Sequence, residues 1–466
     1  MKTLNYFLLL LCLPMAVQSQ TSFQYTHVQE SLLLEAADVI EKNDGEFLFA
    51  HSPSSGWSQL GLGKLSSQGQ WLSENIVGTG EGYSLRPFVY APLQNGQYLL
   101  ISDSTDCPWI ICTSRMKLIR LSEDGDFIST DSLDMPHNSL LMDHALENDA
   151  LLTILSRNTV TGSQLHGFDT EGNLLWSQNY QLPAGQGNFR LLAHTPVQAG
   201  GYMLAGYLTN GNRMVMIQTD NAGDTLWTKS TGVMWNTYRA TEIVQVQDEH
   251  FYLTGDTAAY NEPTDIHLTK TDALGNIIFC KKYGGDGVDY AKSILALENN
   301  EFVILGTTYS FGAGGSDYYL IKTDAEGNLI WSKTFGTSND ETAKSIRRTA
   351  DGGFIISGDR DNGIYEQNLF IVKTDAEGNL AEVVDSQIEN NRYPIPNPAQ
   401  DIVNFNTNER VVAVALMDAT GRIVLTHQDN FGVHSVSVSS LPNGYYTYLT
   451  TLEDRSQHAG KILVQR

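Results

Sequence analysis

One phrase returns through the middle of the 466-residue chain at intervals of about fifty residues. Its clearest copy reads Thr323-Asp324-Ala325-Glu326-Gly327-Asn328-Leu329-Ile330-Trp331. The copies align on one glycine, with spacings of 56, 47, 51, 52, 52 and 51 residues, at Gly69, Gly125, Gly172, Gly223, Gly275, Gly327 and Gly378. A fixed period in this range is typical of a repeat architecture, in which each unit packs against its neighbours.

A second marker keeps the same period, because turn residues precede a short apolar strand seven times, as at Gly45-Glu46-Phe47 and Gly353-Phe354. Each unit therefore reads as four short strands. In the sixth unit the predicted strands are 291–297, 302–307, 318–323 and 329–333.

The repeated phrase joins strands three and four. Its Asp accepts backbone hydrogen bonds as the turn begins, and its Gly takes the left-handed conformation that closes a short hairpin. The Trp or Phe four residues after that Gly is predicted to pack between neighbouring sheets. Cys280 is predicted to take such a docking position, as a buried small hydrophobic residue.

Seven four-stranded units predict an all-β protein whose residues 20–384 form a seven-bladed β-propeller. Residues 32–43 have apolar spacing that also suits a helix, but their register with the repeats favours the first strand of blade one. The segment 22–28 is the candidate to complete the last blade and close the ring.

The repeats, over residues 30–385, resemble the propeller repeats of secreted bacterial proteins and the tryptophan-docking repeats of quinoprotein-type propellers. They differ from the sialidase Asp-box, in which Asp precedes Gly by two positions, whereas here the gap is three. The resemblance therefore implies no sialidase chemistry.

The N-terminus has the pattern of a secretory signal peptide over residues 1–19. Lys2 precedes the apolar run Phe7–Leu13, and Val17 and Ser19 are the small residues before the cleavage point at Gln20. The run is too short to span a bilayer comfortably. We therefore expect no integral membrane segment after cleavage. A lipid anchor on Cys12 is the weaker alternative, because leucines precede it.

The repeat stops after Leu380, residues 385–392 read as a polar linker, and residues 393–466 read as a small β-sandwich. Four phrases mark this end: Tyr393-Pro394-Ile395-Pro396-Asn397-Pro398, Asp418-Ala419-Thr420-Gly421-Arg422, Leu441-Pro442-Asn443-Gly444-Tyr445-Tyr446 and Gly460-Lys461-Ile462-Leu463-Val464. Apart from the extra Ile395, this pattern resembles the type A sorting domain of the type IX secretion system.

The resemblance implies that the type IX secretion machinery is a partner, and that the protein is secreted or displayed on the outer-membrane surface. It also implies removal of the domain within residues 385–392. The residues that carry the sorting motif are Tyr393, Pro394, Pro396, Asn397, Pro398, Asp418, Gly421, Gly444, Gly460 and Lys461.

Motifs for chemistry are largely missing from the sequence. It has no His-Glu-x-x-His, no histidine pair at metal spacing and no Gly-x-Ser-x-Gly. We therefore predict no catalytic residue, metal ligand or cofactor, with calcium on the acidic surface as an open alternative. Cys107 and Cys112 are predicted to form a local disulfide in the exported protein, with free thiols or a metal pair as the alternatives.

The net charge of −24, from 29 Lys and Arg against 53 Asp and Glu, disfavours nucleic-acid partners. The variable loops of a propeller favour ligand binding instead. Aromatic side chains on the predicted loop face suit a glycan or a protein, although each could simply pack against a blade. The candidates are Trp57, Tyr83, Trp109, Trp235, Tyr238, Tyr260, Tyr290 and Tyr309.

The sequence thus predicts an exported propeller that serves as a binding or scaffold module for a glycan or protein ligand. Two alternatives stay open at this point. One is an extracellular polysaccharide hydrolase or lyase that uses two facing carboxylates. The other is a calcium-stabilised structural module of the cell surface.

Overall fold

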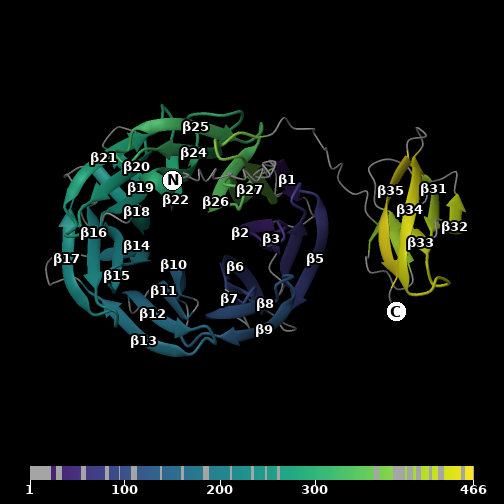
Figure 1. Ribbon diagram of the computed structural model, residues 1–466, viewed down its shortest axis with the longest axis horizontal. Coiled ribbons are helices and arrows are strands. Elements are labelled where there is room, and N and C mark those ends of the chain that lie inside the picture. Colours follow the sequence, from purple (N-terminus) through teal and green to yellow (C-terminus); the bar gives the residue numbers. More distant parts are fainter. Residues whose placement is uncertain are drawn as a thin grey trace, which may run out of the picture. The chain divides into compact units, whose positions relative to one another are not determined.

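In a computed structural model the chain divides into two compact units, Met1–Val383 and Val384–Arg466. The first unit is a seven-bladed β-propeller, built from seven four-stranded antiparallel sheets around a ring (Figure 1). The structure describes residues 23–27, 34–53, 59–78, 83–93, 95–106, 113–136, 139–148, 150–158, 162–181, 188–209, 213–231, 236–246, 249–259, 263–361, 367–380, 394–395, 402–405, 411–418, 422–428, 435–452 and 457–464.

Six blades use four strands that are consecutive in the chain. Their bounds, four strands to a blade, are β2 (Leu34–Glu41), β3 (Phe47–Pro53), β4 (Gln59–Leu65), β5 (Trp71–Gly78); β6 (Tyr83–Pro92), β7 (Tyr98–Asp106), β8 (Thr113–Leu121), β9 (Phe127–Ser132); β10 (Leu140–Glu147), β11 (Leu151–Asn158), β12 (Gly162–Asp169), β13 (Leu174–Tyr180); β14 (Phe189–Pro196), β15 (Tyr202–Leu208), β16 (Met214–Thr219), β17 (Thr225–Thr231); β18 (Asn236–Gln245), β19 (Phe251–Ala259), β20 (Asp265–Thr271), β21 (Ile277–Tyr283); and β22 (Asp289–Ala296), β23 (Phe302–Thr308), β24 (Asp317–Thr323), β25 (Leu329–Phe335). A single 3-10 turn, Glu298–Asn300, joins β22 to β23.

The seventh blade closes the ring with strands from both ends of the propeller. β26 (Asp340–Arg348), β27 (Phe354–Asp361) and β28 (Gln367–Thr374) are joined by β1 (Phe23–His27), which pairs with β28 in antiparallel fashion. This confirms the closing role predicted for 22–28. β2 is a strand, not a helix, which confirms the prediction for residues 32–43.

The sixth blade shows how closely sequence pattern and structure agree. Its strands β22 to β25 begin and end within two residues of the predicted ranges. In the turn between β24 and β25, Asp324 Oδ1 accepts hydrogen bonds from the backbone N–H of Glu326 at 3.0 Å and of Asn328 at 2.7 Å. Gly327 has φ +71°, a left-handed conformation that a side chain would strain.

At five of the seven blade boundaries an aromatic ring packs one blade against the turn of the next, and at Gly125 and Gly172 leucines take this place. The ring of Trp331 lies where a β-carbon on Gly378 would sit, and Phe279 takes the same place against Gly327. Phe23 of β1 does so against Gly69, which continues the contact from the last blade to the first. The predicted role of the aromatic four residues after Gly is therefore confirmed.

The prediction for Cys280 was wrong. The fourth residue after Gly275 is Phe279, whose ring contacts Tyr252 at a centroid distance of 6.3 Å. Cys280 is the next residue along β21, and in the pleat of a strand successive side chains point to opposite faces. It is half-buried and accepts a hydrogen bond from the Thr269 hydroxyl at 3.2 Å.

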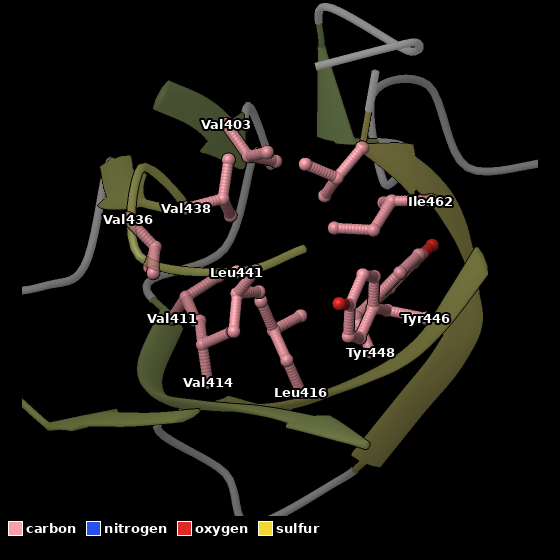
Figure 2. Close-up of a cluster of buried hydrophobic side chains, with 11 residues drawn as sticks. Val403, Val411, Val414, Leu416, Val436, Val438, Leu441, Tyr446, Tyr448 and Ile462 are labelled. Atoms are coloured by element: carbon pink, nitrogen blue, oxygen red, sulfur yellow. The ribbon is translucent and has the colours of Figure 1, made fainter. Parts of the chain in front are cut away.

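The second unit is a sandwich of two small antiparallel sheets. One contains β29 (Pro394–Ile395), β30 (Ile402–Phe405) and β33 (Ser435–Ser437). The other has the order β32 (Ile423–Gln428), β31 (Val411–Met417), β34 (Gly444–Leu452), β35 (Gln457–Val464). The two sheets bury a common apolar core, in which Val403 and Val436 face Leu416, Tyr448 and Ile462 (Figure 2).

Within the described residues of both units, no helix has the length and apolar character needed to cross a bilayer.

Candidate ligand-binding site

The first strand of each blade lines the axis of the ring (Figure 1). All seven of these strands contain a β-bulge, seen as a break in their pairing with the second strand. The break skips Met142 in β10, Thr241 in β18, Lys292 in β22 and Lys344 in β26. A bulge redirects side chains, so these strands can place polar groups toward the axis while still pairing with the blade.

The axis contains a cavity of about 1070 Å³, which we call the axial cavity. Residues of β2, β6, β10, β18, β22 and β26 line it, together with the turn Lys42–Gly45 and Ala350. Asn43, Asp44 and Ala350 are exposed, so the cavity opens at the end of the ring that carries the turns between first and second strands. Its volume suits a small ligand.

The wall of the axial cavity carries both signs of charge. Its ionisable side chains are Asp38, Glu41, Asp44, Asp143, Glu242, His144, Lys42, Lys292, Lys344, Arg347 and Arg348. Five are Lys or Arg and five are Asp or Glu, whereas the whole chain has 29 against 53. The described part of the wall is thus less acidic than the chain as a whole, and this balance opposes an anion less than the average composition would.

Most of these charges are already paired. Arg347 Nε lies 3.1 Å from both carboxylate oxygens of Asp38, which is 2% exposed and also accepts a hydrogen bond from the Ser345 hydroxyl. Lys344 Nζ lies 3.1 Å from the buried Asp359. The bidentate contact of Arg347 with Asp38 links β26 to β2 of the neighbouring blade, and the charge-assisted contact of Lys344 with Asp359 lies within the seventh blade.

Asp143 and His194 form a second link across a blade boundary. Asp143 Oδ2 accepts hydrogen bonds from the His194 backbone N–H at 2.6 Å, and lies 3.0 Å from His194 Nδ1. Burial acts to raise the pKa of Asp143, but the contacts with His194 outweigh it, and the pKa lies below its usual value. His144 also faces the cavity, and burial lowers its pKa to about 4, so its imidazole is neutral at pH 7.

Lys292 and Glu242 differ from these paired groups in their contacts. Among the described residues, no side chain lies within hydrogen-bond or ion-pair distance of the Lys292 ammonium. It is exposed to the water of the cavity, yet protein surrounds it, and burial followed by the charge of Lys344 lowers its pKa. The axial cavity therefore presents one cationic group with no protein anion in contact.

Glu242 is held by neutral donors. Its Oε2 accepts a hydrogen bond from the Ile294 backbone N–H at 2.6 Å, and Ser293 donates to the same carboxyl group. Burial raises the pKa of Glu242 to about 7, with a smaller contribution from the charge of Asp143. A carboxyl group that is half protonated at neutral pH can either donate or accept a hydrogen bond to a ligand.

Of the aromatic residues predicted as ligand contacts, the structure describes the side chains of only Tyr290 and Tyr309, and neither lines the axial cavity. Tyr290, in β22, and Tyr309, just after β23, are 47% and 52% exposed. Tyr83 lies in β6 and Tyr238 in β18, but their side chains are not among those described. Outside the described residues are Trp57, Trp109, Trp235 and Tyr260, together with Cys107 and Cys112. Their predicted roles stay predictions.

No cluster of three or more His, Cys, Asp or Glu side chains that could hold a metal ion occurs within the described residues. The predicted sorting residues fall partly inside the described chain. Pro394 lies in β29, Gly444 begins β34, and Gly460 and Lys461 lie in β35. Asp418 accepts a hydrogen bond from the Arg422 backbone N–H at 3.1 Å in the turn after β31. Tyr393, Pro396, Asn397, Pro398 and Gly421 lie outside the described residues, as does the predicted signal peptide.

The sequence analysis missed the axial cavity. Lys292 occurs in Asp289-Tyr290-Ala291-Lys292-Ser293, which reads as an ordinary strand with a polar outer face. The signal that could have found it is a difference between repeats: Lys292 and Lys344 occupy a position that holds Met142 and Thr241 in other blades.

Comparison with known families identifies the family of the second unit. The family model for the secretion system C-terminal sorting domain matches residues 394–465. The C-terminal unit is a type IX sorting domain. The sorting domain directs the protein out of the cell, to the surface or the medium, by the type IX secretion machinery. No curated protein matches the chain.

Among solved structures, the propeller is similar to a catalytically inactive virginiamycin B lyase from Staphylococcus aureus with quinupristin. The identity is 9% and the TM-score 0.48, over 76% of this chain and 99% of that one. A protein of unknown function from Dyadobacter fermentans has 12% identity and a TM-score of 0.41, over 75% and 98% of the two chains. Sqt1 from Chaetomium thermophilum has 8% identity and a TM-score of 0.43, over 75% and 99%. Similarity at this level has no bearing on the function of this propeller.

Proposed function

We propose that this protein is an exported binding module that takes a small carboxylate-bearing ligand, such as an acidic sugar, in the axial cavity of the propeller. One observation carries the proposal: Lys292 presents an ammonium group to the cavity with no described side chain in contact. A ligand carboxylate would supply the missing partner.

The composition of the wall supports an anionic ligand over a cationic or apolar one. The carboxylates Asp38 and Asp143 already accept hydrogen bonds from Arg347 and His194, which leaves them less able to hold a ligand cation. Among the side chains that the structure describes, no Trp, Tyr or Phe lines the cavity. Recognition there would rest on charge and hydrogen bonds, and not on stacking against a sugar ring.

The test is isothermal titration calorimetry on the full mature chain. The probes are galacturonate and glucuronate, with galactose and glucose as neutral counterparts. We expect the acids to bind and the neutral sugars not to bind. Lys292→Met should weaken binding at least tenfold, because an ion pair in a partly enclosed site is lost.

Lys333→Met is the matched control. Lys333 lies on β25, the outer strand of the same blade, away from the axial cavity, and its removal should leave affinity unchanged. Equal losses in both variants would show that the general charge of the surface, and not the cavity, attracts the acids. Binding that is as tight in Lys292→Met as in the wild type would refute the site.

A polysaccharide-cleaving enzyme is the second candidate. It is favoured by two neighbouring first strands that supply a carboxyl group with a raised pKa, Glu242, and an ammonium group with a lowered pKa, Lys292. Groups shifted toward neutrality are common among general acids and bases. Incubation with polygalacturonate, followed by chromatography of the products, separates the two functions: new short oligosaccharides mean cleavage, and unchanged polymer means binding alone.

We propose further that residues 1–19 are cleaved as a signal peptide before the sorting domain acts. Deleting residues 393–466 should then leave the processed propeller in the periplasm. N-terminal sequencing of that product should begin at Gln20. A start at Met1 would contradict the signal-peptide proposal.

Calcium remains a separate proposal for the acidic surface. If calcium stabilises the fold, the unfolding temperature of the full chain should fall when EDTA is added and recover with excess calcium. An unfolding temperature that is the same in EDTA and in calcium would rule this role out.

A further inference from the structure

We infer that Glu242 is protonated when a carboxylate ligand occupies the axial cavity, and that binding therefore takes up a proton from solution. The inference rests on the proposed function and assigns to Glu242 the role of hydrogen-bond donor to the ligand. On this inference, two residues on adjacent blades, Lys292 and Glu242, together select ligands that carry a carboxylate.

The immediate contacts of Glu242 leave one carboxyl oxygen able to carry a proton. Oε2 is occupied by the Ile294 N–H at 2.6 Å, and the remaining contact is with the Ser293 hydroxyl, which can also accept a hydrogen bond. Both partners are neutral. Nothing in direct contact with this carboxyl group requires it to be an anion.

The charged groups that face Glu242 from the neighbouring strands do not neutralise it either. Asp143, on β10, adds a like charge, although it is hydrogen-bonded to His194 of β14. Lys292, on β22, lowers the pKa of Glu242 by its charge, and this influence is weaker than those of burial and Asp143.

The remaining cationic side chains of the cavity form ion pairs with groups other than Glu242. Lys344, on β26, pairs with Asp359 at 3.1 Å, and Arg347 of the same strand pairs with Asp38 of β2. The imidazole of His144, next to Asp143, is neutral at pH 7. Among the described side chains of these facing strands, Lys292 is thus the one cation that is left to offset a negative charge on Glu242.

A ligand carboxylate that pairs with Lys292 makes the surroundings of Glu242 more negative. It neutralises the ammonium group, and it adds a second negative charge near Glu242. Two carboxylates that share a site cannot both ionise easily, and one of them takes up a proton. The protonated Glu242 then donates an O–H hydrogen bond to the ligand carboxylate, which is a short, charge-assisted contact.

The cost of this protonation is small at neutral pH. Burial holds the pKa of Glu242 at about 7 in the empty protein, so roughly half of the molecules already carry the proton. Above that pH the proton must be taken from solution, and the affinity should fall by up to about tenfold for each pH unit. Neutral sugars gain nothing from the proton, and the pH dependence should be specific to acids.

The experiment is calorimetric titration of the full mature chain with galacturonate at pH 8, in phosphate and in Tris. Tris absorbs much more heat than phosphate when it gives up a proton, so proton uptake by the protein appears as a difference in apparent enthalpy between the buffers. We expect the wild type to take up close to one proton per ligand, and its affinity to weaken between pH 7 and pH 9.

Glu242→Gln should bind galacturonate with no enthalpy difference between the buffers and with the same affinity from pH 7 to pH 9, because an amide donates without titrating. Glu326→Gln, in the exposed turn after β24, is the control and should behave as the wild type. A wild type that binds with the same enthalpy in both buffers would overturn the inference and leave the proposed function standing. No heat with any acid would overturn both.

Discussion

The rim and the axis of the propeller are built from the same repeat but use it differently. At the rim, Trp331, Trp227 and Phe279 occupy equivalent positions and pack against equivalent glycines of the next blade. At the axis, the bulged position holds Met142, Thr241, Lys292 or Lys344. At the rim, where five of the seven blade boundaries dock an aromatic ring on a glycine, the residues largely repeat. At the axis, where we propose that one ligand binds, they differ from blade to blade.

The difference also appears in the energetics. The turns and docking contacts of the rim are stabilised locally, by hydrogen bonds inside the turn and by apolar contacts across the blade boundary. At the axis, Lys292 and Glu242 are surrounded by protein without a mutual ion pair. A partly enclosed charge without its partner costs stability. The axis should therefore contain positions at which substitution stabilises the protein, and the rim should not.

The largest effect should come from the rim. Trp331→Ala removes a docking aromatic that packs between blades six and seven, and should lower the free energy of unfolding by about 3 kcal/mol. Ile330→Ala, one position earlier and 46% exposed, should change it by less than about 0.5 kcal/mol. Denaturant unfolding of the full chain, followed by tryptophan-independent circular dichroism, measures both. Similar losses in the two variants would contradict the docking role.

At the axis, Glu242→Gln should stabilise the protein by about 2 kcal/mol at pH 8 and by much less at pH 5. The folded-state pKa of about 7 lies above the unfolded value, so the folded protein binds more protons between pH 4.5 and pH 7. Stability from this group is present at low pH and is lost as the pH rises through 7. Denaturant midpoints at the two pH values test this, and a variant less stable than the wild type at pH 8 would disprove it.

A buried histidine away from the axis should show the opposite trend. His166 lies 3.0 Å from the Ser156 hydroxyl, and burial lowers its pKa to about 4. Between pH 6.5 and pH 4 the unfolded chain binds more protons, so stability is fully present above pH 6.5 and falls with acidification. His166→Gln should reduce the wild-type loss between pH 6.5 and pH 4.5 by about 1 to 2 kcal/mol. His427→Gln, in the exposed part of β32, should leave that loss unchanged.

The smallest effect is expected on the face with the long loops. Tyr309→Ala removes a side chain that is 52% exposed and should change the unfolding free energy by less than about 0.5 kcal/mol. Its affinity for galacturonate should equal that of the wild type, because Tyr309 does not line the axial cavity. Weaker binding of longer oligosaccharides by this variant would show that the loop aromatics extend the site, as the sequence analysis predicted.

The fold could be predicted from the sequence because the residues that form the turns and the docking contacts recur in successive repeats. Gly327 and its equivalents mark the turns, Trp331 and its equivalents mark the docking contacts, and both recur in step. The site could not be found in the same way. A bulge is a matter of backbone pairing with the second strand, and neither Lys292 nor Lys344 carries a local sign of it. Which charges remain unpaired depends on partners such as Asp359, which lie on another strand.

The pairing of β1 with β28 has a consequence for export. Phe23 pairs with Lys373, so the first strand of the propeller needs the last one as its partner. On the proposal that residues 1–19 act as a signal peptide, the chain crosses the inner membrane from its N-terminus and presents β1 first and β28 only after all the blades between them. Pairing of β1 with β28 then has to wait until β28 has crossed, when only the C-terminal sorting domain remains to follow.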